Sequence, residues 1–86
     1  MKILEGIVEN IRFSTSISGD EHGTSSSQVA VFDIGHQPVQ IALSESIAIK
    51  NGDDILVAGK SIRGLFRGLA YYNKTNGVKG KESTWI

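Results

Sequence analysis

Residues 51–64 read NGDDILVAGKSIRG, and this stretch decides between a nucleotide-binding loop and a β-strand. Its tripeptide Gly59-Lys60-Ser61 matches the end of a phosphate-binding loop, but that motif requires another glycine five positions before Gly59, where this chain has Asp54. A carboxylate there would repel phosphate groups. The spacer 55–58 is an unbroken apolar run, which is typical of a buried strand. We therefore predict a strand over residues 55–60 and no nucleotide-binding loop.

The rest of the chain also alternates as strands do. Alternation of side chains and the spacing of turn residues predict four more strands, at residues 2–17, 29–34, from Pro38 to Leu43, and 65–73. The second and third of the five strands form a hairpin around Gly35-His36-Gln37. The first is unusually long, and Gly6 with the change of apolar pattern around Val8 indicates a bend or bulge there.

The segments between these strands are short or polar. Residues 18–27 are small, polar and without periodicity, which predicts a mobile loop. Residues 44–52 have room for one helical turn that ends at Asn51-Gly52. Asn76-Gly77 predicts a final turn, of the type I′ hairpin kind, and residues 79–86 form either a short strand or a loose tail.

Two short patterns on this framework resemble the OB-fold. Residues 52–60, GDDILVAGK, are similar to its fourth strand, and residues 6–11, GIVENI, are similar to the opening of its first strand. The element order also fits, so we expect an all-β, five-stranded OB-like barrel that forms a single domain over residues 1–86. The resemblance implies binding of oligonucleotides or oligosaccharides across strands two and three.

Composition limits the class of protein. Hydrophobic residues make up 40% of the 86 residues, and there are no cysteines, so disulfides, thiolate zinc sites and thiol nucleophiles are ruled out. The sequence has no apolar run long enough to span a bilayer and no secretory signal pattern, so we expect a cytoplasmic protein without membrane partners. Residues 1–45 hold two basic and six acidic side chains, whereas residues 46–86 hold seven basic and three acidic ones. We interpret this asymmetry as internal charge balance, with a basic binding face as the alternative.

The chain offers little for catalysis. His22 and His36 are isolated in a loop and a turn, and the adjacent pairs Asp20/Glu21 and Asp53/Asp54 are better explained by solvation or turn capping than by acid–base chemistry. We therefore expect no enzyme activity, no catalytic residues, no metal and no cofactor.

Two hypotheses of function remain. If the second and third strands turn their larger apolar side chains inward, the outer face there lacks the aromatic and basic residues that single-stranded nucleic acid needs; it carries Val29, Val31, Asp33, Gln40 and Ala42. We therefore favour a non-catalytic interaction module that docks on a protein partner or on itself. The alternative is a nucleic-acid-binding domain that uses the basic, aromatic C-terminal half, with Lys60, Arg63, Arg67, Tyr71 and Tyr72.

The expected partner surface lies on the last two long strands. Lysine and arginine must point out of a narrow barrel, which also places alternate apolar residues outside. The resulting partner-binding residues are Leu56, Lys60, Leu65, Arg67, Leu69 and Tyr71, with Arg67 and Tyr71 as anchors. The inner side would then hold Phe66, Gly68, Ala70 and Tyr72. The alternative for this patch is that the tail, with Val78, Trp85 and Ile86, folds back and covers it.

Overall fold

The part of the chain that the structure describes forms six β-strands. A computed structural model describes residues 1–20, 23–43 and 46–82, with the backbone alone for 15–20 and 23–26. Within these residues the chain contains no helix, so the predicted all-β class is confirmed. The strands are β1 (Lys2–Asp20), β2 (Gly23–Ile34), β3 (Gln37–Leu43), β4 (Asp54–Ile62), β5 (Leu65–Asn73) and β6 (Lys79–Lys81).

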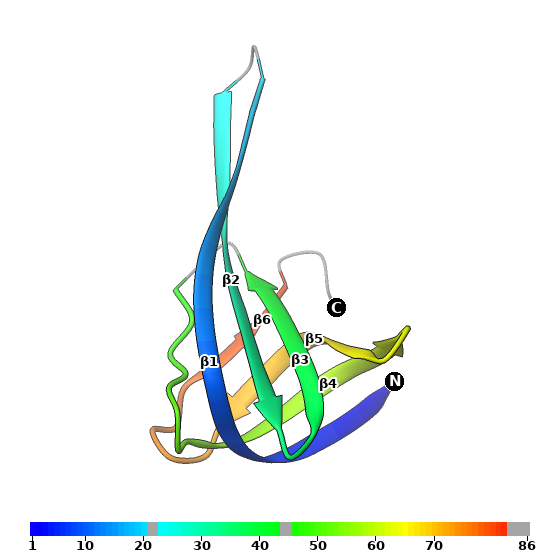
Figure 1. The fold of residues 1–86 in the computed structure, drawn as a ribbon. Helices are drawn as coiled ribbons and strands as arrows, with labels where there is room; N and C mark the ends of the chain where they lie inside the picture. Colours follow the sequence, from blue (N-terminus) through cyan, green and yellow to red (C-terminus); the bar gives the residue numbers. More distant parts are fainter. Residues whose placement is uncertain (21–22, 44–45, 83–86) are drawn as a thin grey trace.

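The first five strands close into a mixed barrel (Figure 1). Antiparallel pairs join β3 to β2, β2 to β1, β1 to β4 and β4 to β5, and a parallel pair between β3 and β5 completes the circle. The sixth strand adds to β5. This arrangement fits an OB-like small barrel at a coarse level, as the sequence predicted.

One strand serves two sides of the barrel because β1 changes partner in its middle. Residues 2–7 pair with β4, and the pairing with β2 begins at Val8. The expected change of side around Gly6 and Val8 is therefore confirmed, but the bulge lies slightly further along, between Glu9 and Arg12. Asn10 supplies the left-handed backbone there, with φ of 54°. A short polar side chain tolerates that conformation better than a bulky one does.

The predicted loop over residues 18–27 is wrong for the part of the chain that the structure describes. Residues 18–20 pair with 23–25, and the ladder continues without a break to residue 14 opposite 29. The hairpin projects well beyond the barrel, which helps give the molecule extents of 42 × 28 × 26 Å (Figure 1). Its polar sequence lacks an amphipathic pattern because a ribbon outside the barrel has no core to face.

The core lies inside the barrel and comes from alternate positions of each strand. The inward facing expected for the larger apolar side chains of β2 and β3 is confirmed, and their neighbours Val29, Val31, Asp33, Gln40 and Ala42 are half-buried on the outside. The buried apolar side chains of β1 to β4 are Val8, Ala30, Phe32, Ile34, Val39, Ile41, Leu43, Ile55 and Val57.

The expected helical turn between β3 and β4 is wrong for residues 46–50, which have no regular secondary structure; residues 44–45 lie outside the described chain. Ile47 and Ile49 are both buried, two positions apart, which is the period of an extended chain rather than a helix. Side chains of β2 and β5 hold the backbone of this segment. The amide of Ile47 donates to Gln28 Oε1 at 2.7 Å, and that of Ala48 donates to Tyr71 Oη at 3.1 Å.

A buried polar pair holds the same segment from its other end. Asp53 is 2% exposed and Asn73 is fully buried. Asn73 Nδ2 donates to Asp53 Oδ2 at 2.7 Å and to the carbonyl of Ala48 at 2.9 Å. Asp53 Oδ2 also accepts from the amide of Lys50 at 3.0 Å, and Asn73 Oδ1 accepts from the amide of Thr75 at 3.0 Å. These bonds satisfy the buried groups and attach the segment before β4 to the end of β5.

The two remaining turns differ in type. The β4–β5 hairpin turns at Arg63 and Gly64, whose φ values of 52° and 83° are those of a type I′ turn. At Asn76-Gly77 only the glycine has positive φ, so the type I′ turn expected there is wrong. The turn is instead part of a longer connection in which Asn73 and Val78 pair through the backbone.

Candidate interaction surface

The outer face of β1, β4 and β5 carries two rows of aligned side chains that continue onto β6. Residues directly opposite each other in antiparallel strands lie on the same face of the sheet. The register therefore defines one row of Ile3, Ala58, Ala70 and Lys81, and a second row of Glu5, Leu56, Tyr72 and Lys79.

The middle of these rows forms a shallow apolar depression. It is lined by Ile3, Leu56, Ala58, Ala70, Tyr71 and Tyr72. Two of these side chains project strongly into solvent, since Ile3 is 71% exposed and Tyr72 is 39% exposed. A contiguous exposed patch of this kind is more typical of an interaction surface than single scattered apolar residues are. We call it the β1–β4–β5 face.

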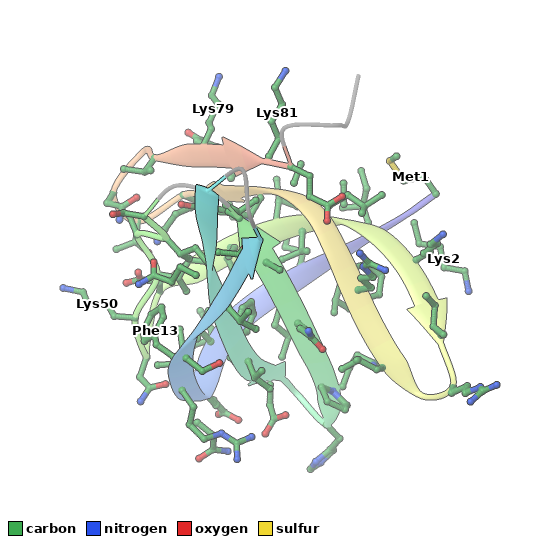
Figure 2. All side chains as sticks on the ribbon, turned by 90° about the horizontal axis from the view of Figure 1, so that it is seen from above. Met1, Lys2, Phe13, Lys50, Lys79 and Lys81 are labelled. Carbon is green, nitrogen blue, oxygen red and sulfur yellow. The ribbon has the colours of Figure 1, made fainter. Side chains whose placement is uncertain are left out.

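Charges of opposite sign border the β1–β4–β5 face on its two sides. Lys79 and Lys81 project side by side from β6, away from the barrel (Figure 2), and Lys79 Nζ lies 5.8 Å from the centroid of the Tyr72 ring. On the β1 side, Glu5 forms an ion pair with Lys74, whose Nζ also lies 3.4 Å from Asp54 Oδ1. The hydrogen bond that Lys74 donates to Glu5, with a smaller contribution from Asp54, raises the pKa of Lys74 against the opposing effect of desolvation.

Tyr71, expected as an outward anchor, is buried at 4% exposure, and that expectation is wrong. The reason is a bulge in β5. Ala58 pairs with Ala70 but the next residue, Gly59, pairs with Gly68, so Leu69 is an extra residue in β5. The insertion reverses the side of the sheet on which each following side chain of β5 lies, so Tyr71 points inward and Tyr72 points outward. The inward Tyr71 lies against Gly80 of β6, where a Cβ would lie only 2.5 Å from its ring.

The other expected partner residues do not form one continuous stripe. Leu56 lines the β1–β4–β5 face, whereas Leu65 and Arg67 line a second depression between β3 and β5. Lys60 is exposed opposite Arg67, and Leu69 is half-buried. The side chains around this second depression, the β3–β5 depression, are Gln40, Ala42, Ile62, Leu65 and Arg67.

The tail expected to cover the outer patch is described only as far as Glu82. Residues 79–81 form a strand, which agrees with one of the two outcomes expected for them, and Val78 before it is exposed. Trp85 and Ile86 lie outside the described residues. Glu82 continues along β5, since its amide donates to the carbonyl of Leu69 at 2.9 Å.

Comparison with protein-family models, with curated protein sequences and with solved structures finds no match for this chain.

The structure also places the residues that the sequence offered as candidates for nucleotide or metal binding. The Gly59-Lys60-Ser61 tripeptide lies within β4, so its interpretation as a strand is confirmed. His36 lies exposed in the β2–β3 turn, while His22 lies outside the described residues. Among the residues that the structure describes, no cluster of three His, Cys, Asp or Glu side chains could hold a metal, and no helix could cross a membrane.

Sequence reasoning missed most of the β1–β4–β5 face. Alternation predicts both Ala70 and Tyr72 inside the barrel and assigns Ile3 to no surface, whereas the register places all three on the outer face. The first strand has apolar residues at both odd and even positions, such as Ile3 and Leu4, so alternation alone does not tell which side faces the core. The pairing of β1 with β4 decides it, and that pairing joins distant parts of the chain.

Proposed function

We propose that this protein is a non-catalytic interaction module that associates through the β1–β4–β5 face. The observation that carries the proposal is the exposure of Ile3 and Tyr72 in the lining of an apolar depression. Burial of apolar surface is the main favourable term in protein association, and tyrosine is enriched among the residues that contribute most to it. The bordering lysines and glutamate supply a polar rim of the kind that surrounds such interfaces.

The occupant that fits this face best is a second copy of the chain. The second row begins with Glu5 on β1 and ends with Lys79 on β6, with Leu56 and Tyr72 between them. A two-fold axis parallel to the strands and lying between the two copies reverses the row. It brings Glu5 of each copy over Lys79 of the other and Leu56 over Tyr72. Closed two-fold dimers are the commonest homo-oligomers, and their interfaces must be self-complementary in this way.

Replacing Ile3 by lysine should abolish dimer formation while the barrel stays folded. Ile3 is 71% exposed, so the change costs little in the monomer. The same axis reverses the first row and sets Ile3 over Lys81 of the other copy, so the variant places like charges against each other in the dimer. The matched control is Ile62→Lys, because Ile62 is an exposed isoleucine on the β3–β5 depression instead. Light scattering coupled to size-exclusion chromatography should give a dimer mass for the wild type and Ile62→Lys, and a monomer mass for Ile3→Lys. A monomeric wild type would overturn the proposal of a second copy.

A charge exchange tests the symmetry of the dimer. Glu5→Lys and Lys79→Glu should each weaken association, because each places like charges opposite one another across the two-fold axis. The double variant restores opposite charges and should recover much of the affinity. Recovery would identify a second copy as the occupant, since a different partner has no reason to compensate both changes. Failure of the double variant to exceed either single variant would contradict the two-fold arrangement.

One observation favours the alternative of nucleic-acid binding. Lys79 lies over the exposed ring of Tyr72 with Lys81 beside it, and an aromatic platform with cations is how single strands are bound. Fluorescence anisotropy with a labelled oligo-dT strand at low salt tests this directly. We expect no saturable binding. Binding that falls steeply with added salt and is lost in Tyr72→Ala would favour the alternative, because phosphate neutralisation makes affinity salt-dependent.

A further inference from the structure

The outer face beside the β3–β5 depression carries two positive charges at directly opposite positions. Lys60 of β4 pairs with Arg67 of β5, and both side chains are exposed. On the other side of β5, Arg67 pairs with Gln40 of β3, so the three residues form one row across the outer face, which we call the Arg67 row. Like charges directly opposite each other destabilise a sheet. An anion bound between Lys60 and Arg67 removes that cost.

The neighbouring chain supplies little negative charge to the Arg67 row. The sequence has six basic and no acidic residues between Asp54 and Glu82. Within the described residues, Arg67 forms an ion pair with Glu82, at 3.6 Å between Nη2 and Oε1, while its side chain stays 54% exposed. Glu82 thus shows that a carboxylate fits against Arg67 from the outside, and it leaves much of the guanidinium accessible to another one.

Apolar side chains lie on both sides of the Arg67 row. Ile62 of β4 pairs with Leu65 of β5 two positions from the row, so both lie on the same outer face. Ala42 follows Gln40 by two positions in β3, on the opposite side of the row. These three residues line the β3–β5 depression together with Gln40 and Arg67. The depression therefore has a cationic centre between two apolar ends.

An extended peptide has the same spacing. Residues two apart in a strand lie on one face, and they are separated by about 6.6–6.8 Å. If a peptide runs parallel to the strands over this face, a carboxylate above the Arg67 row has its alternate neighbours above Ile62 and Leu65 on one side and above Ala42 on the other. Strands packed face to face on a sheet keep their directions within about 30° of each other, so this arrangement is an ordinary one.

The lining favours a peptide over a nucleic acid. Bases of single strands bind by stacking on aromatic rings, whereas the residues that line the β3–β5 depression are aliphatic or polar. Tyr71, which the sequence placed next to Arg67 on the outside, is buried. Aliphatic walls suit leucine, isoleucine or valine side chains, and a guanidinium binds a carboxylate through two parallel hydrogen bonds.

We propose that the β3–β5 depression binds an extended segment of a partner protein in which an acidic side chain has apolar side chains two positions away on each side. Arg67 and Lys60 bind the carboxylate, and the aliphatic lining contacts the apolar side chains. Glu82 competes for Arg67 and so limits the affinity. This site goes beyond association through the β1–β4–β5 face, and either proposal can fail without the other.

A synthetic peptide tests the proposed pattern. The probe is Ser-Leu-Ser-Glu-Ser-Leu-Ser with both ends blocked, titrated into the isotope-labelled full chain. Saturable shifts should appear in the amide signals of Gln40, Ile62, Leu65 and Arg67. A peptide with glutamine in place of glutamate, and another with serine in place of both leucines, should each bind at least about tenfold more weakly. No shift at these residues, or equal binding of the three peptides, would overturn the proposal.

Two variants separate a specific site from general attraction between opposite charges. Arg67→Gln and Lys50→Gln each remove one exposed positive charge, but Lys50 projects from the opposite side of the molecule to Lys2, which pairs with Gly59 next to Lys60 (Figure 2). Arg67→Gln should weaken binding of the probe at least about tenfold, and Lys50→Gln by less than about twofold. Equal losses would mean general attraction and would overturn the proposal.

Competition by Glu82 predicts a gain of affinity on mutation. Glu82→Gln should strengthen binding of the probe severalfold, because it releases Arg67. Glu9→Gln is the matched control, since it removes an exposed acid from β1 and should have a clearly smaller effect. Equal gains would contradict competition by Glu82. Oligo-dT is the last comparison: if it shifts the same signals while the peptide does not, the occupant is a nucleic acid and the proposal is overturned.

Discussion

Gly59→Ala should lower the melting temperature by about 12–24 °C, because an overpacking cost near 3 kcal/mol shifts a domain of this size by roughly 4–8 °C per kcal/mol. A Cβ at Gly59 would lie far inside van der Waals contact with the backbone carbonyl oxygen of Arg67, and within 3.0 Å of the Cα of Gly68. Backbone atoms in the middle of a ladder cannot move aside as a side chain can. The substitution should therefore separate β4 from β5 at the bulge.

Gly6→Ala is the matched control for this effect. A Cβ there would approach Cγ2 of Ile34 to 2.5 Å, which is a side-chain methyl group that another rotamer can move. Thermal unfolding followed by circular dichroism should show a clearly smaller loss for Gly6→Ala than for Gly59→Ala. An equal or larger loss for Gly6→Ala would mean that β4 and β5 tolerate separation at Gly59, contrary to the geometry.

Asn73→Ala should destabilise the protein by roughly 3–5 kcal/mol, the range found when one partner of a buried charged network is removed. Asn73 is fully buried, and its amide nitrogen binds both Asp53 Oδ2 and the carbonyl of Ala48. Alanine leaves the carboxylate of Asp53 with one fewer donor in a site that water does not reach. The amide of Thr75 loses its acceptor in the same change. Urea denaturation would measure the loss.

Asn76→Ala separates burial from hydrogen bonding in that experiment. Asn76 Nδ2 also donates to the carbonyl of Ala48, at 3.2 Å, and its Oδ1 accepts from the amide of Val78, but the residue is exposed. Water can replace both bonds, so we expect a loss of about 1 kcal/mol or less. Equal losses in the two variants would show that the buried pair contributes no more than an ordinary surface bond.

The parts of the fold that the sequence predicted are those governed by local alternation. In β2, β3 and β4 each strand has one clearly apolar face. Alternation alone therefore identifies Phe32, Ile41 and Val57 as side chains that face the core. The barrel class follows from the number and spacing of such strands. Where both faces see solvent, as in the β1–β2 hairpin outside the barrel, the pattern disappears and a strand looks like a loop.

The surface was less predictable because it depends on pairing between distant segments. The facing of Tyr71 and Tyr72 is reversed by the extra residue Leu69, and that bulge follows from the close pairing of Gly59 with Gly68. A sequence of two consecutive tyrosines gives no sign of which one is inside. The same holds for Lys79 and Lys81, whose placement beside the β1–β4–β5 face requires β6 to pair with β5.

The parallel pairing of β3 with β5 has a consequence for how the protein folds. The β2–β3 and β4–β5 hairpins can each form early from neighbouring residues, but the contact of Val39 with Phe66 must wait until both hairpins exist. Barrels dominated by such distant contacts fold in milliseconds to seconds, more slowly than helical proteins. During that interval the edges of β3 and β5 are exposed, and an unpaired strand edge is a template for other chains. In a crowded cell, closure of the barrel is therefore also the step that removes the risk of aggregation.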